Sequence, residues 1–501
     1  MRFRCLKPYY YNTLIVSKTA TNAPIVNQSF VFGAQNDGVN RAYDDVAAQQ
    51  NVLFVNGINT NASPAAIPSP GSSYNGITVG AVDRAVTPLA DNRSKPDLVA
   101  PGSTASSFTV PLVSGAAALL RQSALAEDAG SGTASAASDM RTIKALILNG
   151  AVKPVGWSNT STQPLDRPNG AGVLNVNQAQ LQLAAGRFYP TADEVLTESG
   201  AAHPPPSGVS GAVNSSSGWA LGTVTNTTSG SFFNRVEHDV TDHYFFDLSA
   251  SEASSFYLTS TLVWNRQNGR SSINNLNLYL YTADGTLVAE SVSSVDNVEH
   301  LFQRHLAPGR YVLQVHKPYN NGRITNSETY ALAFSFTPAP VPAGPGAVAA
   351  SAVSTTEIDL SWTDTSDDET GYRLLRRVDG ESEYTLIATL GADIITYRDS
   401  GLQSVTAYDY QLVAFNPEGE AVATSSATTF TEIESWRFSF FGTGENSGDG
   451  ADDNDFDLDL TPNLVEYLTG SDPTVVSPSA LDRTMLVSDR RISFEWRTGT
   501  P

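Results

Sequence analysis

The sequence predicts a multidomain protein in which an α/β domain with a parallel sheet is followed by all-β sandwich domains. Strand-like and helix-like segments alternate over residues 1–186, which is typical of a parallel sheet with helical crossovers. Short runs of alternating apolar and polar residues dominate from residue 209 onward. The 501 residues are enough for several domains of about 100–200 residues each.

The charge balance and the single cysteine exclude several classes of protein. The chain has 30 basic and 51 acidic side chains and a formal net charge of −21, which argues against nucleic acid or an anionic membrane as a partner. Cys5 cannot form a disulfide within the chain. No apolar run reaches the ~20 residues of a membrane-spanning helix, and the first residues lack the apolar stretch of an export signal. We expect a monomer without a membrane span.

The first predicted elements build a parallel sheet. Residues 24–32 and 51–55 are rich in β-branched and aromatic side chains and predict two strands. Residues 39–50 predict a helix between them, and residues 76–82 predict a third strand. After the segment considered next, residues 139–150 predict another helix, with an acidic cap at its start and a glycine at its end.

A loop that leads into a helix spans residues 93–120. Pro96 and Pro101 keep the loop from being helical, and the small and apolar residues from about Phe108 onward predict a buried helix. A serine therefore lies at a helix start, where unpaired N–H groups and the helix dipole suit an oxyanion. The alternative is an N-cap, the usual role of a serine before an apolar run.

This segment resembles the nucleophile segment of the subtilisin-like serine peptidases, the subtilases. Their usual form is Gly-Thr-Ser-x-Ala-x-Pro-x-Val-x-Gly, and Pro111, Val113 and Gly115 match its second half. With that alignment, Ser107 matches the family's nucleophile. The sequence departs from the family pattern beside the nucleophile, at Ala105 and Thr109.

The resemblance extends over residues 23–184. Residues 26–29 are similar to the family's Ile-Asn-Met-Ser strand, and residues 77–83 are similar to its Val-x-Ala-Val-Gly-Ala-Val-Asp strand. Residues 170–175 resemble the Gly-Ala-Gly-x-Val-Asn segment that closes a subtilase domain. The first domain is therefore expected to occupy residues 1–186.

The resemblance also implies an oxyanion donor in the loop after the second strand. The family has Ala-Ala-Gly-Asn there, and its Asn side chain donates to the oxyanion. A strict count from Gly57 puts Ile58 in that place, which cannot donate. Asn59 is one residue further and would donate if the loop shifts. The alternative is an ordinary turn asparagine.

Two residues that the resemblance implies are missing. A serine hydroxyl needs a base, and in this family the order along the chain is Asp, His and then Ser. All six histidines of this chain follow Ser107. We therefore expect a partial catalytic domain that lacks the Asp and His segments and is inactive as written. A degenerate, non-catalytic relative is the alternative.

Two β domains are expected after the catalytic part. A linker at residues 187–208 precedes residues 209–336, which resemble the jelly-roll domain that follows the catalytic domain in many secreted subtilases. A second, proline-rich linker follows at residues 337–345. Residues 346–431 resemble a fibronectin type III domain. The residues that carry this likeness are Trp362 in a core strand and a tyrosine-corner pattern of Leu402, Tyr408 and Tyr410.

Residues 432–501 are expected to hold an acidic calcium loop and the start of a further β segment. Carboxylates at positions 1, 3, 5 and 12 of a twelve-residue loop, with Asn at position 9, match the oxygen ligands that Ca²⁺ needs. The candidate ligands are Asp455, Asp457, Asp459, Asn463 and Glu466. The segment is similar to the calcium-loop repeats near the ends of secreted bacterial proteins. Against this, Leu460 replaces the usual glycine and Pro462 is unusual inside such a loop. The alternative is a disordered acidic run.

Two functions remain open from the sequence. The resemblance implies a secreted or cell-surface bacterial serine endopeptidase that is stabilised by Ca²⁺ and cleaves protein or peptide substrates through an acyl-enzyme. The alternative is a non-catalytic extracellular adhesion or scaffold protein built from β-sandwich and fibronectin type III modules.

Overall fold

The computed structural model describes residues 15–18, 23–82, 84–130, 132–154, 156–190, 195–205 and 215–476, and the backbone of two strands at 484–488 and 491–495. The chain forms two compact units, Met1–Ala339 and Pro340–Pro501. Cys5 lies outside the described residues. Within those residues, none of the helices combines the length and the apolar character needed to cross a bilayer.

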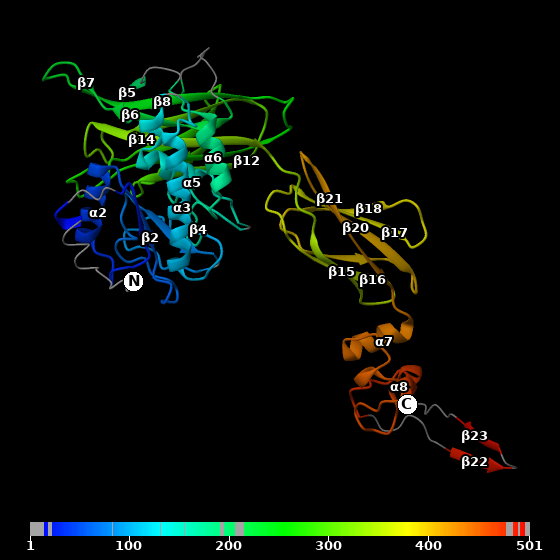
Figure 1. Cartoon of the computed structure of the whole chain (residues 1–501). Helices are drawn as coiled ribbons and strands as arrows, with labels where there is room; N and C mark the ends of the chain where they lie inside the picture. The colour runs from blue at the N-terminus through cyan, green and yellow to red at the C-terminus, as the bar shows by residue number, and fades with distance from the viewer. Residues whose placement is uncertain are drawn as a thin grey trace. The chain divides into compact units, whose positions relative to one another are not determined.

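A four-stranded parallel sheet forms the first part of the Met1–Ala339 unit (Figure 1). Its order is β1 (Ile25–Gln28), β2 (Leu53–Gly57), β3 (Ile77–Ala81) and β4 (Leu98–Ala100). The strands β2, β3 and β4 are buried along their whole length, as expected for a sheet with both faces covered. The predicted alternation of strands and helices is therefore present.

Several α-helices are described in this part of the chain. They are α2 (Asp37–Gln50), α3 (Ser106–Leu125), α4 (Ala134–Ala137), α5 (Met140–Asn149) and α6 (Val176–Ala185). The expected start of α5 is confirmed, because the Asp139 side chain caps it by accepting from the Arg141 N–H. The helix α3 packs across all four strands, whereas α5 and α6 pack on the sheet that follows.

An antiparallel β-sandwich completes the Met1–Ala339 unit. One sheet has the order β11-β10-β13-β8-β5, with β7 pairing to β8, and the other has the order β12-β9-β14-β6. The strands are β5 (Val195–Glu198), β6 (Ser217–Thr225), β7 (Thr228–Ser229), β8 (Val236–Leu248), β9 (Phe256–Trp264), β10 (Asn277–Thr282), β11 (Leu287–Ser291), β12 (Val298–Leu306), β13 (Gly309–Lys317) and β14 (Ser327–Pro338). The expected all-β domain is present.

The α/β part and this sandwich share one apolar core. Buried side chains of the sandwich, such as Trp219 and Val263, belong to the same cluster as Leu146 of α5. The segment expected as a linker, 187–208, differs from that expectation because it contains β5, which pairs with β8. The physical reason is that Val195–Glu198 is in reach of the edge of β8 and pairs with it antiparallel over residues 238–241, which satisfies backbone groups that a free linker would leave to solvent.

A second β-sandwich forms most of the Pro340–Pro501 unit. Its sheets have the orders β15-β16-β19 and β18-β17-β20-β21. The strands are β15 (Gly346–Ala352), β16 (Glu357–Thr363), β17 (Gly371–Val378), β18 (Thr385–Gly391), β19 (Thr396–Ser400), β20 (Ala407–Asn416) and β21 (Gly419–Thr428). Three strands facing four in this order is the arrangement of a fibronectin type III-like sandwich.

The core of this sandwich agrees with the sequence analysis. Trp362 is buried and its ring contacts Tyr372 edge-on. The Tyr408 hydroxyl accepts a hydrogen bond from the Gln403 N–H at 3.0 Å, and Leu402 and Tyr410 are buried beside it. A tyrosine hydroxyl bonded to backbone a few residues upstream is the tyrosine corner.

The rest of the chain is partly helical. It contains α7 (Glu432–Phe441), the short 3₁₀ helix η2 (Gly448–Gly450), α8 (Asn463–Thr469) and a hairpin of β22 (Thr484–Ser488) and β23 (Arg491–Glu495). Thr431 and Glu434 form a capping box at the start of α7. The hairpin agrees with the expected further β segment.

A buried ion cluster fixes the end of the parallel sheet. The Asp97 carboxylate lies 2.5 Å from Lys95 Nζ and 3.3 Å from Lys144 Nζ, and all three side chains are at most 3% exposed. It also accepts the Thr78 N–H at 2.6 Å. Burial opposes ionisation, but Lys144 and Lys95 hold the pKa of Asp97 below its usual range. Burial lowers the pKa of Lys95 to about 8.

Replacing Asp97 should destabilise the Met1–Ala339 unit strongly. Asp97→Asn leaves two buried ammonium groups without a counter-charge, and breaking a buried ion pair in this way costs about 3–5 kcal/mol. We expect this loss in the free energy of unfolding, measured with urea and tryptophan fluorescence. The matched control is Asp247→Asn, which removes a half-exposed partner of Arg310 in the same unit and should cost less than about 1 kcal/mol. Equal losses for the two variants would contradict the role given to Asp97.

Candidate functional site

Ser107 lies exposed in the first turn of α3, at the carboxyl edge of the parallel sheet. The helix begins two residues earlier than the apolar run suggested. Its N-cap is Ala105, which has no side-chain oxygen, so neither Ser106 nor Ser107 acts as the cap. Ser103 instead orders the preceding turn, because its hydroxyl accepts the Ala105 N–H at 3.0 Å. Ser107 is therefore not the N-cap of α3.

The two neighbouring serines have different roles. Ser106 is buried, and its hydroxyl donates to the Ile58 carbonyl at 2.6 Å. A Cβ on Gly57 would lie only 3.0 Å from the Ser106 Oγ, so the end of β2 approaches α3 closely at a residue without a side chain. No described residue hydrogen-bonds to the Ser107 hydroxyl, although the Ser29 hydroxyl donates to the Ser107 carbonyl at 3.3 Å.

One face of α3 differs from the sequence expectation. The helix was expected to be buried, but Phe108, Leu112 and Leu119 are 70%, 48% and 58% exposed. Spacings of four and seven residues put these side chains on one stripe of the helix, starting beside Ser107. The opposite face, with Val113 and Leu120, is fully buried against the sheet. We name the exposed stripe of Phe108, Leu112 and Leu119 the apolar stripe.

Asn59 takes part in a turn near the end of β2. Its N–H donates to the Ala66 carbonyl at 2.7 Å, and its side-chain oxygen accepts the Asn61 N–H at 3.2 Å. Ile58 is buried in a small apolar cluster with Ala65. No hydrogen bond among the described residues joins Asn59 to α3. The turn accounts for Asn59 without an oxyanion, and its donor role stays a prediction.

None of the six histidines contacts Ser107 among the described residues, because each has partners in the first sandwich or the segment before it. Their partners are Gln314 for His203 and His243, Ser229 for His238, Thr261 for His300, the Tyr257 ring for His305 and Asp239 for His316. Burial lowers the pKa of His243 to about 4, so this imidazole is neutral at pH 7. The part of the chain that the structure describes therefore provides Ser107 with no histidine as a general base.

The predicted calcium loop brings its three aspartates together before α8. Oxygens of Asp455, Asp457 and Asp459 all lie within 4.8 Å of one another. The Asp455 carboxylate accepts the N–H groups of Asp459 at 3.0 Å and Leu460 at 2.8 Å, which curls the loop around it. The segment is thus an ordered turn rather than a disordered acidic run.

The two residues that seemed to disfavour the loop fit its geometry. Leu460 takes the left-handed backbone expected of the missing glycine, with φ of 73°, and Leu458 does the same with φ of 65°. Such a conformation costs a residue with a side chain roughly 1–2 kcal/mol. Pro462 is the N-cap of α8, a position where a helix does not need its N–H.

Glu466 and Asn463 leave buried oxygens without partners. Glu466 is fully buried, and neither of its carboxylate oxygens accepts a hydrogen bond. Burial and the charges of Asp457, Asp459 and Asp455 raise the pKa of Glu466 to about 7. The Asn463 amide donates to the Asp449 and Ala451 carbonyls, but its oxygen has no partner. Oxygens of this kind beside three aspartates are the donor set that a hard cation such as Ca²⁺ takes.

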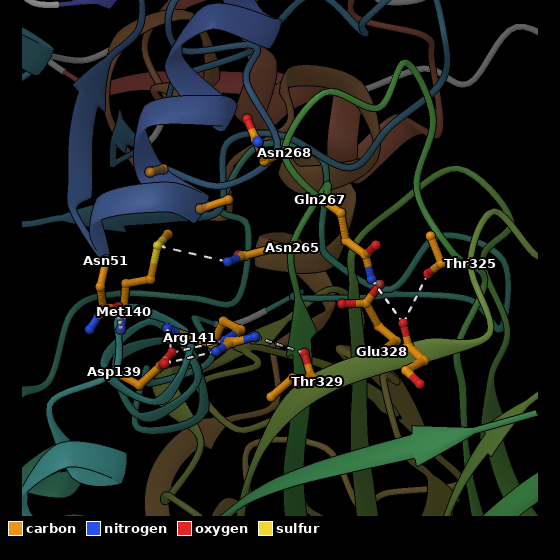
Figure 2. A pocket seen from close by; sticks show the side chains of 13 residues that line it. Asn51, Asp139, Met140, Arg141, Asn265, Gln267, Asn268, Thr325, Glu328 and Thr329 are labelled. Atoms are coloured by element: carbon orange, nitrogen blue, oxygen red, sulfur yellow. Dashed lines mark hydrogen bonds and ion pairs between the residues drawn. The ribbon is translucent and has the colours of Figure 1, made fainter. Parts of the chain in front are cut away.

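A polar pocket between α2, α5 and the first sandwich was not expected from the sequence (Figure 2). Its volume is roughly 630 Å³, and it is lined in part by Asn51, Arg141 and Glu328. Glu328 is 2% exposed and accepts from Asn274 at 2.6 Å and from Gln267 at 2.8 Å. Burial raises the pKa of Glu328 to about 7. These residues come from distant segments, so no local sequence signal marks the pocket.

Comparisons with known proteins address only a fraction of the chain. No known protein family and no curated protein matches the sequence. Among solved structures, FN3tt is 25% identical and matches over 18% of this chain and 98% of its own, with a TM-score of 0.17. A Fn3-like protein from Clostridium thermocellum is 24% identical over 19% of this chain and 97% of its own, with a TM-score of 0.16. The fn3 domain of human collagen alpha-1(XX) chain is 16% identical over 19% of this chain and 90% of its own, with a TM-score of 0.17. The fibronectin type III-like fold of β15–β21 follows from its own strand order and tyrosine corner.

The stability of the Met1–Ala339 unit should depend on the protonation of Glu328. Since the pKa of Glu328 is raised to about 7 in the folded chain from a usual 4.5, the folded chain holds this proton to higher pH than the unfolded chain. The contribution of this proton to the free energy of unfolding is complete below about pH 4.5. It is lost as the pH rises through 7, by at most ~1.4 kcal/mol per pH unit. Glu328→Gln should therefore have the same melting temperature as the wild type at pH 4.5 and a higher one at pH 8.

The matched control is Glu290→Gln, which alters an exposed carboxyl of the same unit. It should show no such pH-dependent difference from the wild type in melting temperature. A difference between Glu328→Gln and wild type that is the same at both pH values would contradict the raised pKa.

Proposed function

We propose that this chain carries the nucleophile-bearing part of a subtilisin-like serine peptidase, in which Ser107 attacks a peptide carbonyl. The observation that supports this most directly is the exposed Ser107 in the first turn of α3, at the carboxyl edge of a parallel sheet. Ligands of open parallel sheets bind at that edge. The resemblance of residues 105–115 to the family's nucleophile segment supports the same assignment.

The chemistry assigns a role to each group. The Ser107 hydroxyl forms the acyl bond as the peptide C–N bond breaks, and a histidine takes its proton and passes it to the leaving amine. The Ser107 N–H lies in the first turn of α3, where N–H groups have no partner within the helix, and it stabilises the developing oxyanion together with the Asn59 amide. The substrates are proteins or peptides.

The histidine and its aspartate must come from a segment that packs against β1 and α3. Among the described strands, β1 pairs only with β2, so its other edge is open to a further parallel strand. The apolar stripe of α3 starts beside Ser107 and exposes side chains that a neighbouring segment would bury. The open edge of β1 and the apolar face that starts beside Ser107 support a catalytic site that such a segment completes.

A second candidate function is a non-catalytic extracellular scaffold. It is favoured by the β15–β21 sandwich, whose fibronectin type III-like topology has no part in acyl transfer. In this case the β modules bind or space partners, and the serine-bearing part is vestigial. Both candidates place the chain outside a bacterial cell, as a secreted or surface protein.

Ca²⁺ is the proposed structural cofactor of the loop before α8. Asp455, Asp457, Asp459, Asn463 and Glu466 would hold it through oxygen atoms, and the ion would compensate the buried Glu466 carboxylate. The left-handed Leu458 and Leu460 fit a backbone that wraps a cation.

The peptidase proposal predicts activity only when a base is supplied. The purified chain of 501 residues should leave casein intact. Fused behind the Asp- and His-bearing segment of a subtilisin-like peptidase, it should hydrolyse casein, and Ser107→Ala should lower that rate about 10⁵–10⁶-fold. Ser123→Ala, on the same helix, is the matched control and should keep the rate. Hydrolysis that survives Ser107→Ala would remove Ser107 as the nucleophile, and an inactive but folded fusion would favour the scaffold.

The calcium proposal predicts a specific gain in stability. Saturation at a hundredfold excess over Kd stabilises a site by about 2.7 kcal/mol, so CaCl₂ should raise the melting temperature of the Pro340–Pro501 unit. Asp455→Asn and Glu466→Gln should each reduce that gain. Asp453→Asn, an exposed carboxylate of the same acidic segment outside the loop, should leave it unchanged. A gain that is the same in all three variants would rule out this loop as its source.

A further inference from the structure

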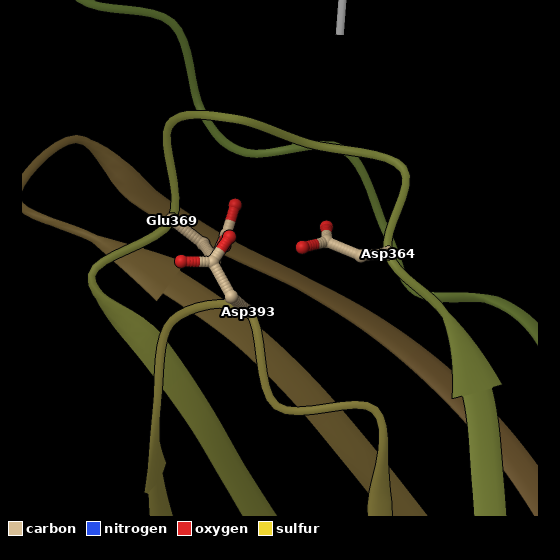
Figure 3. A group of neighbouring side chains, drawn as sticks. All are labelled: Asp364, Glu369 and Asp393. Atoms are coloured by element: carbon tan, nitrogen blue, oxygen red, sulfur yellow. The ribbon is translucent and has the colours of Figure 1, made fainter. Parts of the chain in front are cut away.

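Three carboxylates converge at one end of the fibronectin type III-like sandwich (Figure 3). Asp364 and Glu369 belong to the β16–β17 loop, and Asp393 belongs to the β18–β19 loop. One oxygen of each lies within 4.8 Å of one oxygen of each of the others. The sequence separates Asp393 from the other two by more than twenty residues, and no calcium-loop spacing relates the three.

Glu369 is the member of the cluster that needs a partner. It is 7% exposed, and its Oε2 is buried without a hydrogen bond from any described group. Its carboxylate is drawn toward those of Asp393 and Asp364 in Figure 3. A buried carboxylate oxygen with no donor carries an uncompensated desolvation cost. Two further carboxylates beside it increase that cost rather than relieving it.

The electrostatics of the cluster also favour a positively charged partner for Glu369. Burial raises the pKa of Glu369, the negative charges of Asp364 and Asp393 raise it further, and the backbone N–H groups of Glu369 and Asp393 only partly oppose these effects. A cation placed between the carboxylates would offset their mutual repulsion and supply the buried Glu369 oxygen with a partner.

The surroundings hold the carboxylates in a fixed arrangement. The Asp364 carboxylate accepts the Tyr372 hydroxyl at 3.0 Å and the Ser366 N–H at 3.1 Å. Asp393 is exposed and takes a left-handed backbone with φ of 61°, so solvent and ions reach the cluster from its side. Tyr372 itself is buried in the core of the sandwich. The cluster is thus anchored on one side and open on the other.

We propose that Asp364, Glu369 and Asp393 bind one Ca²⁺ ion, which ties the β16–β17 loop to the β18–β19 loop. Oxygens that lie within 4.8 Å of one another are close enough to converge on one ion with ligand distances of about 2.3–2.6 Å, and Ca²⁺ accepts such oxygens in flexible geometry, whereas Mg²⁺ demands near-ideal octahedral geometry. The remaining coordination positions face solvent and take water. This site shares no residue with the loop before α8.

The test uses the full chain with the other loop disabled by Asp455→Asn and Asp457→Asn. Calorimetric titration of this chelator-stripped protein with CaCl₂ should show one binding event. Glu369→Gln and Asp393→Asn should each weaken that event at least about tenfold, because each removes one charged ligand of three. The matched control is Glu420→Gln, an exposed carboxylate of the same sandwich that pairs with Arg373, and it should leave the affinity unchanged.

A second readout separates an ion site from a purely structural carboxylate. Without Ca²⁺, Glu369→Gln should melt at a higher temperature than its parent, since it removes a buried unpaired charge. With saturating CaCl₂ the order should invert, since only the parent gains from the ion. Absence of a binding event, an event unaffected by both ligand variants, or one weakened equally by Glu420→Gln would overturn the proposal.

Discussion

The Asp97 carboxylate connects the elements that place Ser107. It receives Lys95 from its own loop, Lys144 from α5 and the Thr78 N–H from β3, all out of contact with water. A Cβ on Gly170 would lie 2.4 Å from the Asp97 backbone, so the closing segment also passes directly against it. The strand β4 starts at the next residue and leads into α3. The position of the exposed serine thus depends on one buried anion that is fully compensated.

The carboxylates of the Pro340–Pro501 unit present the opposite case. Glu466 and Glu369 are buried like Asp97, yet both carboxylate oxygens of Glu466 and the Oε2 of Glu369 lack hydrogen-bond donors among the described groups, and their neighbours are acidic. A protein that buries a charge must pair it or ligate a metal with it. This contrast within one chain is the reason for proposing cations at both sites and none at the Asp97 cluster.

Local signals in the sequence predict local structure well here. The cap at Asp139, the glycine after α5 and the tyrosine corner at Tyr408 are set by neighbours along the chain, and the structure has all three. The length of α3 was harder to predict, because its first turn is held by the Ile58 carbonyl, far away in the sequence.

Features made by distant segments were not predictable in the same way. The pairing of β5 with β8, the pocket at Glu328 and the cluster of Asp364 with Asp393 all depend on which segments meet in space. The calcium loop lies between these cases. Its ligand spacing could be read from the sequence, but the left-handed turn at Leu460 could not, since a leucine gives no signal for it.

The shared core of the Met1–Ala339 unit also bears on how such a protein can be assembled during evolution. Because Trp219 and Val263 complete the packing around Leu146, a gene that gained the α/β part without the first sandwich would encode an exposed apolar surface on α5 and α6. We therefore expect the two parts to be inherited together. An exchange of modules that leaves this core intact is expected after Ala339, where one compact unit ends and the next begins.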